Sequence, residues 1–398
     1  MNYRQAQWKR RWEAIPNAPF IWLGKCLGWL IKKPADTRYF LFFPSADIGG
    51  SPKVNADILQ LIDTYHPLVI FSKKAKNNGF HALFHREGVT VLDLSRQIDH
   101  KGYHFLNIIW RGILATWINQ TPEAIILGGE CIYFYKIVQH IKPSVRVIEV
   151  SHLNTWLNFN QAYIPFIDYR IVSTPKLKRY FEQQYAANGV PTQYLSRLQF
   201  IDNWVDIPEL KTNQHEGLKV LFVGRGAPQK RVPIISAIAE ELMMDSHHFS
   251  FTFVGDVMPL LSPYVQKHAT IYEFVQDKHL LSSLYDDADV LILTSAYEGL
   301  PIVVMDMMAR GKVVLSTAVD GIPDYIQHMQ NGLLIHELID EEKIKREAIQ
   351  LLTMLVENPS LYRTLGDRAR ELACHRFSRK AFETSYSVLL DITARDSA

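Results

Sequence analysis

Short, almost uninterrupted apolar segments alternate with longer amphipathic segments along most of this chain. Such runs, rich in β-branched and aromatic residues, are typical of strands buried on both faces of a parallel sheet. In the first half they predict strands at Tyr39–Phe43, Leu68–Ser72, Val89–Leu92, Ala124–Leu127, Arg146–Val150 and Tyr169–Ser173. In the second half they predict strands at Lys219–Val223, Phe249–Val254, Ala269–Phe274, Val290–Leu293, Val313–Ser316 and Leu333–Ile335.

The segments between these strands have apolar residues at helical spacing. Helices are predicted at Val54–Tyr65, Tyr103–Asn119, Tyr133–His140, Pro233–Met243, Leu280–Tyr285, Glu341–Glu357, Leu361–Arg376 and Lys380–Ile392. Alternating strands and helices predict an α/β fold with doubly wound parallel sheets. A chain of 398 residues has room for two such domains. We expect the crossover between them at 194–208.

The composition limits the function. The hydrophobic fraction is 47%, enough for packed cores, and a net charge of +2 argues against bulk binding of nucleic acid. Three widely spaced cysteines suggest neither a disulfide framework nor a metal knuckle and fit a reducing compartment.

Residues 1–34 differ from the rest of the chain. They are basic and contain Trp8, Trp12, Trp22 and Trp29, four of the eight tryptophans. Apolar residues recur at helical spacing between Phe20 and Ile31, a stretch too short to span a bilayer, and no signal-peptide cleavage site follows. An amphipathic helix with bases and tryptophans suits an anionic membrane surface. The alternative is a helix that packs its apolar stripe on the protein itself.

One stretch, from Leu291 to Asp306, combines a buried strand, a polar turn and Pro301, which is placed to open a helix. Backbone amides and the positive helix end then converge above the carboxyl edge of the strand, where an anion such as phosphate binds well. Glu298 lies in the turn, and Asp306 follows eight residues later. The alternative is that Glu298 only complements the helix dipole and Asp306 is a solvated surface residue.

Other turns after strands are candidates for the same edge of a sheet. Gly49-Gly50 and Gly128-Gly129-Glu130 allow close approach of backbone, although paired glycines often only form a turn. The turn 151–154 contains His152, and a lone histidine is more often structural. In the second half Gly224 opens a turn in which Arg225 and Lys230 could neutralise a diphosphate. The alternative is a pair of surface bases.

The second half resembles retaining glycosyltransferases of the GT-B type, family 4, also called glycosyl transferases group 1. The resemblance covers about residues 218–382, and the first half fits only in outline. Its motif residues are Arg225, Lys230, Ser295, Glu298-Gly299-Leu300-Pro301, Ala309, Gly311-Lys312, Thr317 and Gly321-Ile322-Pro323. The chain departs from the family with Asp306 and Asp324 in place of glutamates, and with Trp204, Arg231 and Asp320 in place of glycines.

The resemblance implies two Rossmann-like domains that face each other across a cleft. The first domain would span 35–208 and the second, which binds the nucleotide sugar, 209–379, with 380–398 crossing back to the first. It further implies transfer of a hexosyl unit from a nucleoside-diphosphate sugar, such as a UDP or GDP sugar, with retention at the anomeric carbon. No metal or other cofactor is expected.

The resemblance also assigns residues to these tasks. The expected catalytic residues are Glu298, His152, Arg225 and Lys230. The expected donor-binding residues are Gly49, Gly50, Gly224, Arg225, Lys230, Phe274, Glu298, Gly299, Leu300, Pro301 and Asp306, with Phe274 near the nucleobase and Asp306 at the ribose.

The basic N-terminal segment beside such a domain predicts a glycan or lipid-linked acceptor in bacterial surface polysaccharide synthesis. The protein would be cytoplasmic and peripherally bound to the inner face of the plasma membrane through residues 1–34. The alternatives are a non-catalytic partner of another transferase with the same fold, or other chemistry on this fold, such as that of a phosphorylase or an epimerase.

Overall fold

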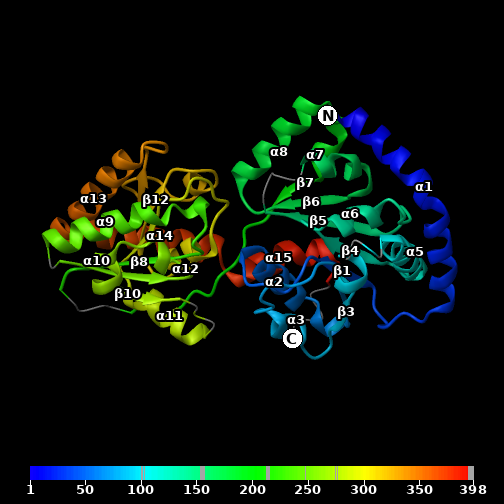
Figure 1. The fold of residues 1–398 in the computed structure, drawn as a ribbon, viewed down its shortest axis with the longest axis horizontal. Coiled ribbons are helices and arrows are strands. Elements are labelled where there is room, and N and C mark those ends of the chain that lie inside the picture. The colour runs from blue at the N-terminus through cyan, green and yellow to red at the C-terminus, as the bar shows by residue number, and fades with distance from the viewer. Residues whose placement is uncertain are drawn as a thin grey trace. The chain divides into compact units, whose positions relative to one another are not determined.

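The computed structural model describes residues 1–99, 102, 104–152, 157–211, 216–246, 248–273, 275 and 277–392. The chain divides into two compact units, residues 1–201 with 383 to the end, and residues 202–382. The crossover therefore follows Ile201, a few residues before the boundary predicted at 208. Each unit is built around one parallel sheet (Figure 1).

The first sheet has the strand order β3-β2-β1-β4-β5-β6-β7. In register, Leu41 of β1 lies between Val69 of β2 and Leu127 of β4. Apolar residues occupy both faces of the central strands because helices cover each side. The strands are β1 (Tyr39–Phe43), β2 (Leu68–Phe71), β3 (Thr90–Asp93), β4 (Ile125–Gly128), β5 (Arg146–Ser151), β6 (Tyr169–Val172) and β7 (Leu198–Phe200).

The sequence predicts β1 to β6 to within one or two residues at each end. It misses β7, which lies in the predicted crossover and pairs with β6. Three residues with a central glutamine give too short an apolar run to stand out. The helices of this unit are α1 (Tyr3–Leu30), α2 (Gly50–Gln60), α3 (His81–Phe84), α4 (Ser95–Ile98), α5 (His104–Gln120), α6 (Ile132–Val138), α7 (Leu157–Asn160) and α8 (Pro175–Asn188).

Helix α1 is longer than the amphipathic stretch predicted from the sequence and includes Pro16 and Pro19. It lies along α5 at the outer side of the first unit (Figure 1). The contact depends on small residues: a Cβ atom on Gly24 would lie 2.0 Å from the Ile109 carbonyl oxygen, and one on Gly112 would lie 2.3 Å from that of Ile21. The predicted packing of this helix on the protein is therefore present, through the glycines together with buried Ile21 and half-buried Leu27.

Most of the large apolar residues of α1 are nevertheless exposed to solvent. The four tryptophans are 57–75% exposed, and Ile15 and Leu30 are 61% and 81% exposed. Lys9, Arg11 and Lys32 are exposed as well. Along the described part of the chain, no helix is long and apolar enough to cross a bilayer.

His140, just after α6, reports on the packing of α1. Burial, together with the nearby cations Lys25, Arg111 and Arg10, lowers the pKa of His140 to about 4. As the pH falls, the unfolded chain, whose histidine pKa is about 6.5, takes up a proton before the folded chain does. The free energy of unfolding is therefore unaffected by His140 above about pH 6.5 and decreases as the pH falls from 6.5 towards 4. We predict a loss of at most about 3 kcal/mol in the free energy of unfolding.

The measurement is urea unfolding between pH 7 and pH 4 for the wild type and for His140→Gln. As the pH falls, the free energy of unfolding of the wild type should decrease more than that of His140→Gln. A difference that stays constant over this range would show that His140 is not titrating as described.

The second sheet has the order β10-β9-β8-β11-β12-β13, with all neighbours parallel. Its strands are β8 (Leu218–Val223), β9 (Phe249–Val254), β10 (Thr270–Tyr272), β11 (Val290–Leu293), β12 (Val313–Thr317) and β13 (Leu333–Ile335). Its helices are α9 (Val232–Asp245), α10 (Pro263–His268), α11 (Lys278–Asp287), α12 (Ile302–Ala309), α13 (Glu341–Glu357) and α14 (Pro359–Arg376).

The last helix, α15 (Arg379–Leu390), ends in the first unit, as the resemblance implies. The Tyr39 hydroxyl donates to the Leu390 carbonyl oxygen at 2.9 Å, and the Arg146 guanidinium donates to that of Leu389 at 2.9 Å. Arg38 pairs with Asp391 at 3.2 Å. These contacts attach the end of the chain to β1 and β5.

Candidate active site

The strand order of the second sheet creates a crevice at one place. Strands β8 and β11 are neighbours, but the chain leaves them towards opposite sides of the sheet. Ligands of open parallel sheets bind at such a switch point, beyond the carboxyl ends of the strands. The loops there are 224–231 after β8 and 294–301 after β11, the two loops that the sequence singles out.

A buried ion pair joins these two loops. Lys230 Nζ bonds to Glu298 Oε1, and the two side chains are only 13% and 8% exposed. Water screens the attraction of such a shielded pair less than that of a surface pair. The structure therefore brings together two of the predicted catalytic residues, from strands that are separated by β9 and β10 in the chain.

Two departures from the family pattern hold the second loop in place. Arg231 and Asp320 have φ angles of +47° and +42°, in the left-handed region that glycine adopts without strain. Arg231 donates to the carbonyl oxygens of Thr294 and Ser295 at 2.7 and 2.9 Å. Asp320 accepts from the Glu298 N–H at 2.9 Å. Both side chains thus bond to the loop, which explains how non-glycine residues are accommodated at these positions.

Further bonds connect the two loops through their backbones. The Ala296 N–H donates to the Gln229 carbonyl oxygen at 2.8 Å, and the Gln229 side-chain amide donates to that of Tyr297 at 2.6 Å. The Thr294 hydroxyl lies 3.2 Å from the Lys230 carbonyl oxygen. The predicted site therefore rests on two loops that support each other, and sequence reasoning missed these supporting residues because side chain to backbone bonds leave no spacing signal.

Arg225 is placed differently from Lys230. Its side chain is exposed, and among the described residues it has no hydrogen-bond or ion-pair partner. Its loop is fixed by the next turn, because the Gly226 N–H donates to Asp256 at 2.7 Å. An exposed guanidinium on an anchored loop is available to an anionic ligand.

Gly255 should be indispensable for this arrangement. Its φ is +136°, and a Cβ atom there would lie 1.8 Å from the Gly224 carbonyl oxygen. We predict that Gly255→Ala lowers the free energy of unfolding by about 1–3 kcal/mol and displaces the Arg225 loop. Gly189→Ala is the matched control, since its φ is +70° but nothing lies within 4 Å of the added atom.

Urea unfolding measures both variants. The control should lose only about 1 kcal/mol, the cost of left-handed backbone alone. Equal losses in the two variants would mean that the contact between Gly255 and Gly224 has no energetic weight.

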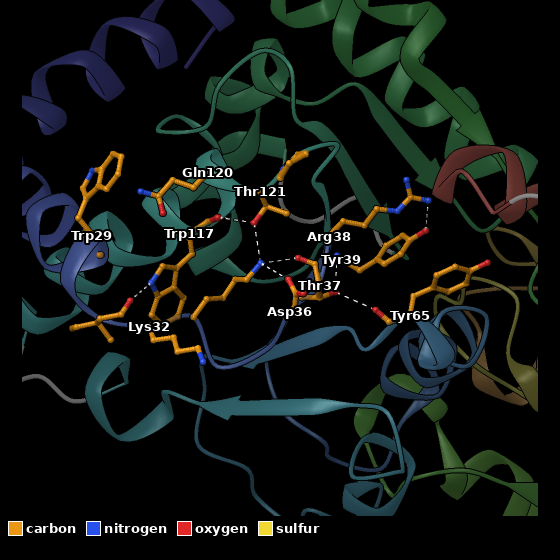
Figure 2. Close-up of a pocket in the computed structure, with 14 residues that line it drawn as sticks. Trp29, Lys32, Asp36, Thr37, Arg38, Tyr39, Tyr65, Trp117, Gln120 and Thr121 are labelled. Atoms are coloured by element: carbon orange, nitrogen blue, oxygen red, sulfur yellow. Dashed lines mark hydrogen bonds and ion pairs between the residues drawn. The ribbon is translucent and has the colours of Figure 1, made fainter.

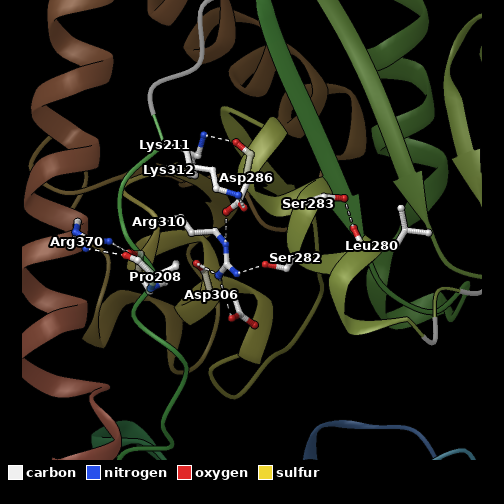
Figure 3. Close-up of polar contacts among 11 residues, drawn as sticks. Pro208, Lys211, Leu280, Ser282, Ser283, Asp286, Asp306, Arg310, Lys312 and Arg370 are labelled. Carbon is white, nitrogen blue, oxygen red and sulfur yellow. Dashed lines mark hydrogen bonds and ion pairs between the residues drawn. The ribbon is translucent and has the colours of Figure 1, made fainter.

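Asp306 lies in α12, whose first residue is Ile302, so Pro301 is the capping residue rather than the first helical residue that the sequence predicts. The Asp306 carboxylate accepts from Arg310 at 3.3 Å, one turn further along the helix (Figure 3). Arg310 also bonds to Asp286 and Ser282, each at 3.0 Å. Asp306 is therefore not a merely solvated residue, and the spacing of four to Arg310 was a signal for this pair. Its predicted role at the ribose stays a prediction.

The first unit has its own polar cluster at the switch point between β1 and β4. Glu130 accepts from the Ser51 hydroxyl at 3.1 Å and from the His152 N–H at 2.9 Å. Ser51 follows Gly49-Gly50 in the first turn of α2, so all three predicted turns of this unit meet here. Burial lowers the pKa of His152, against the opposing effect of Glu130, so the imidazole is neutral at neutral pH.

The imidazole has capacity left for a ligand. His152 Nε2 is shielded from solvent and has no hydrogen-bond partner within the described ranges. Leu153, Asn154 and Phe274 lie outside these ranges, so the predicted contact of Phe274 with a nucleobase is not addressed. Trp204, which replaces a family glycine, packs against the Arg379 guanidinium at 5.5 Å.

Comparison with known proteins agrees with this geometry. Residues 217–354 match the family model described as "Glycosyl transferases group 1". N-acetyl-alpha-D-glucosaminyl L-malate synthase of Bacillus anthracis is 30% identical, over 32% of this chain and 35% of that protein. Alpha-maltose-1-phosphate synthase of Mycolicibacterium smegmatis is 29% identical, over 40% and 44%. WcaL of Salmonella typhimurium, named for colanic acid biosynthesis, is 24% identical, over 44% and 45%. The chain thus matches less than half the length of each of these relatives.

Solved structures extend the likeness to both units. HepE of Anabaena in complex with UDP has a TM-score of 0.69 at 15% identity, over 89% of this chain and 100% of that chain. The lipopolysaccharide outer core galactosyltransferase WaaB has a TM-score of 0.66 at 15% identity, over 89% and 99%. The predicted GT-B fold, with two Rossmann-like domains, is therefore confirmed. Within it, residues 217–354 are the part that matches the glycosyl transferases group 1 family model.

Proposed function

We propose that this chain is a retaining hexosyltransferase that uses a nucleoside-diphosphate sugar. The observation that carries the proposal is the buried pair Lys230–Glu298 beside exposed Arg225 at the switch point of the second sheet. Arg225, Lys230 and the amino end of α12 all belong to the two loops beyond the carboxyl ends of β8 and β11, where we place the leaving diphosphate. This arrangement favours departure of a pyrophosphate group because charge that grows on it meets oriented donors.

Glu298 has a different task in the proposal. Its carboxylate holds Lys230, and its backbone is fixed by Asp320. A carboxylate fixed in this way positions the hydroxyl groups of the donor sugar, for which charged hydrogen-bond acceptors are well suited.

The reaction proceeds on one face of the sugar, in line with the family resemblance. The bond between the anomeric carbon and the diphosphate oxygen breaks, and a new bond to the acceptor oxygen forms on the same face. The proton of the acceptor hydroxyl passes to the leaving phosphate oxygen. Lys230 and Arg225 stabilise that phosphate, so no metal is needed.

The acceptor is proposed to bind at the polar cluster of the first unit. His152 is neutral there and has an unpartnered, shielded Nε2, so it offers a hydrogen bond to a sugar hydroxyl. Gly49 and Gly50 leave the backbone of the adjacent loop open to a ligand. A glycan or a lipid-linked sugar fits such a surface.

A bacterial surface polysaccharide is the proposed product. WcaL is named for colanic acid biosynthesis, and WaaB for the lipopolysaccharide outer core. Lipopolysaccharide carries a lipid, and a lipid-linked acceptor agrees with the exposed indoles and bases of α1. We therefore propose that α1 binds the anionic inner face of the plasma membrane.

A thermal-shift panel tests donor binding. Ligands that bind only the folded state raise the apparent stability. UDP and UDP sugars come first because HepE is described with UDP and UDP-glucose, and GDP, ADP and CMP complete the panel. One nucleotide should stabilise the wild type and leave Arg225→Ala/Lys230→Ala unshifted. If no nucleotide stabilises the wild type, the proposal fails and a non-catalytic partner role takes its place.

Vesicle flotation tests the membrane surface. Deletion of α1 would uncover α5, so we prefer a variant with Trp8, Trp12, Trp22 and Trp29 changed to Gln. This variant should lose binding to vesicles that contain phosphatidylglycerol. The control changes Met244 and Ile339, which are 65% and 87% exposed in the second unit, to Gln. Equal flotation of both variants would refute a role for α1.

A further inference from the structure

A pocket of about 610 Å³ lies where α1 ends and β1 begins. Its walls come from the end of α1, the following turn, the start of β1 and the end of α5 (Figure 2). Trp29, Trp117 and Tyr65 form its aromatic part, and Lys32 and Lys33 line it as well. This volume suits a small polar group with part of an attached chain.

The pocket contains positive charge that the protein does not fully neutralise. Lys33 Nζ donates to the Thr37 carbonyl oxygen at 3.0 Å and to the Thr121 hydroxyl at 3.1 Å, both neutral groups. Its nearest carboxylate is Asp36, 3.9 Å away with a fully exposed side chain. Such a solvated pair at this distance is weak.

The other two cations of the pocket, Lys32 and Arg38, differ in whether a carboxylate pairs with them. Lys32 has no ion-pair partner in the described part of the chain. Arg38 is already engaged by Asp391 and Glu123, at 3.2 and 3.4 Å. Lys32 and the third donor of Lys33 therefore remain available to an anion.

We infer that this pocket binds the phosphate of an anionic glycerophospholipid headgroup. Lys32 and Lys33 bond to the phosphate oxygens, and the aromatic wall of Trp29 and Trp117 contacts the glycerol carbons. Basic pockets next to a membrane-binding surface commonly take headgroups. Trp29 belongs both to this pocket and to the exposed face of α1, so a lipid held here belongs to the membrane that α1 contacts.

This site is separate from the proposed acceptor site of the same unit. Arg38 and Tyr39 mark the amino end of β1, whereas Gly49, Gly50 and His152 follow the carboxyl ends of their strands. The pocket therefore lies at the amino ends of the strands of the first sheet, and the proposed acceptor site lies at their carboxyl ends. The inference rests on the proposed membrane association, and it adds a specific headgroup contact to a general attraction.

The test compares two variants with equal loss of charge on or near α1. Lys32→Gln/Lys33→Gln alters the pocket, and Lys9→Gln/Arg11→Gln alters bases elsewhere on α1. Binding of glycerol phosphate is followed by ³¹P NMR, and flotation uses phosphatidylcholine vesicles with and without phosphatidylglycerol. We expect glycerol phosphate binding to be lost only in the pocket variant, and its affinity for the anionic vesicles to fall at least about tenfold below that of the control variant.

Several outcomes would overturn the inference. Equal loss of flotation in both variants, with no binding of glycerol phosphate, would leave only general surface charge. Binding of inorganic phosphate as tight as that of glycerol phosphate, with flotation unchanged in the pocket variant, would identify a free-phosphate site. Failure of the wild type to float would remove the membrane association and this inference with it. The nucleotide thermal shift depends on the second unit. A normal shift beside a failed phosphate test would overturn only the headgroup inference, whereas loss of the shift would count against the proposed transfer reaction.

Discussion

Replacement of Lys230 by alanine should lower the kcat of glycosyl transfer by about 100- to 1,000-fold, the usual cost of removing one oriented donor from a transition state. Lys230 is anchored by Glu298 and by the loop bonds around Gln229, so its ammonium group is fixed before the substrate binds. Negative charge on the leaving diphosphate grows as its bond to the anomeric carbon breaks. An interaction that strengthens in the transition state affects kcat more than KM.

The variant also leaves Glu298 buried without its cation, which could disturb the loop. Lys230→Ala/Glu298→Gln removes the unpaired charge, so its free energy of unfolding should return towards that of the wild type, while its kcat should be at least as low as that of the single variant because Glu298 also contacts the donor sugar in the proposal. Lys219→Ala is the matched control, because Lys219 lies on β8 but pairs with Asp287 at the surface. Its kcat should equal that of the wild type. A Lys230→Ala enzyme that keeps most of its kcat, while its KM rises, would show that Lys230 serves only ground-state binding.

Replacement of Arg170 by alanine should lower the free energy of unfolding by about 3–5 kcal/mol. Arg170 and Glu149 are 2% and 0% exposed and pair at 2.7 Å. Arg170 also bonds to the Tyr185 hydroxyl at 2.5 Å, and Tyr135 donates to Glu149 at 2.6 Å. Without Arg170, the Glu149 charge would remain buried without a cation, which is the costly part of the change.

Urea unfolding of the wild type and two variants measures this effect. Lys9→Ala is the control, since Lys9 belongs to the same unit but pairs at the surface with Glu13 at 3.9 Å. Exposed pairs contribute about 0–1 kcal/mol, so the control should differ little from the wild type. A loss below about 1 kcal/mol for Arg170→Ala would mean that the buried network relaxes or admits water.

Much of the fold follows from local patterns. The strands β1, β11 and β13 have the bounds that their apolar runs predict, because strands buried on both faces need no alternation. The apolar spacing underestimates the length of helix α1: it starts at Phe20, whereas the helix starts at Tyr3 and continues through two prolines. In those early turns Ala6 is buried and the Gln7 side chain donates to the Ala162 carbonyl oxygen at 2.7 Å, and no local pattern reveals these contacts.

The candidate site could be predicted only in part. The motif resemblance located Lys230 and Glu298, and the sheet topology explains why their loops meet. The bonds of Arg231 and Asp320 depend on left-handed backbone, which a sequence indicates for glycine but not for arginine or aspartate. The pocket at the end of α1 combines residues from α1, β1 and α5, so it exists only once these elements have packed.

The most direct test of the central claim is proton NMR of the reaction product. The wild type is mixed with the sugar nucleotide that the thermal-shift panel selects and with a lipid-linked or oligosaccharide acceptor. We predict acceptor-dependent release of the nucleoside diphosphate and a new glycosidic anomeric proton whose coupling constant has the same α or β character as that of the donor. Donor binding without any acceptor-dependent release would contradict the account and identify a non-catalytic partner of another transferase.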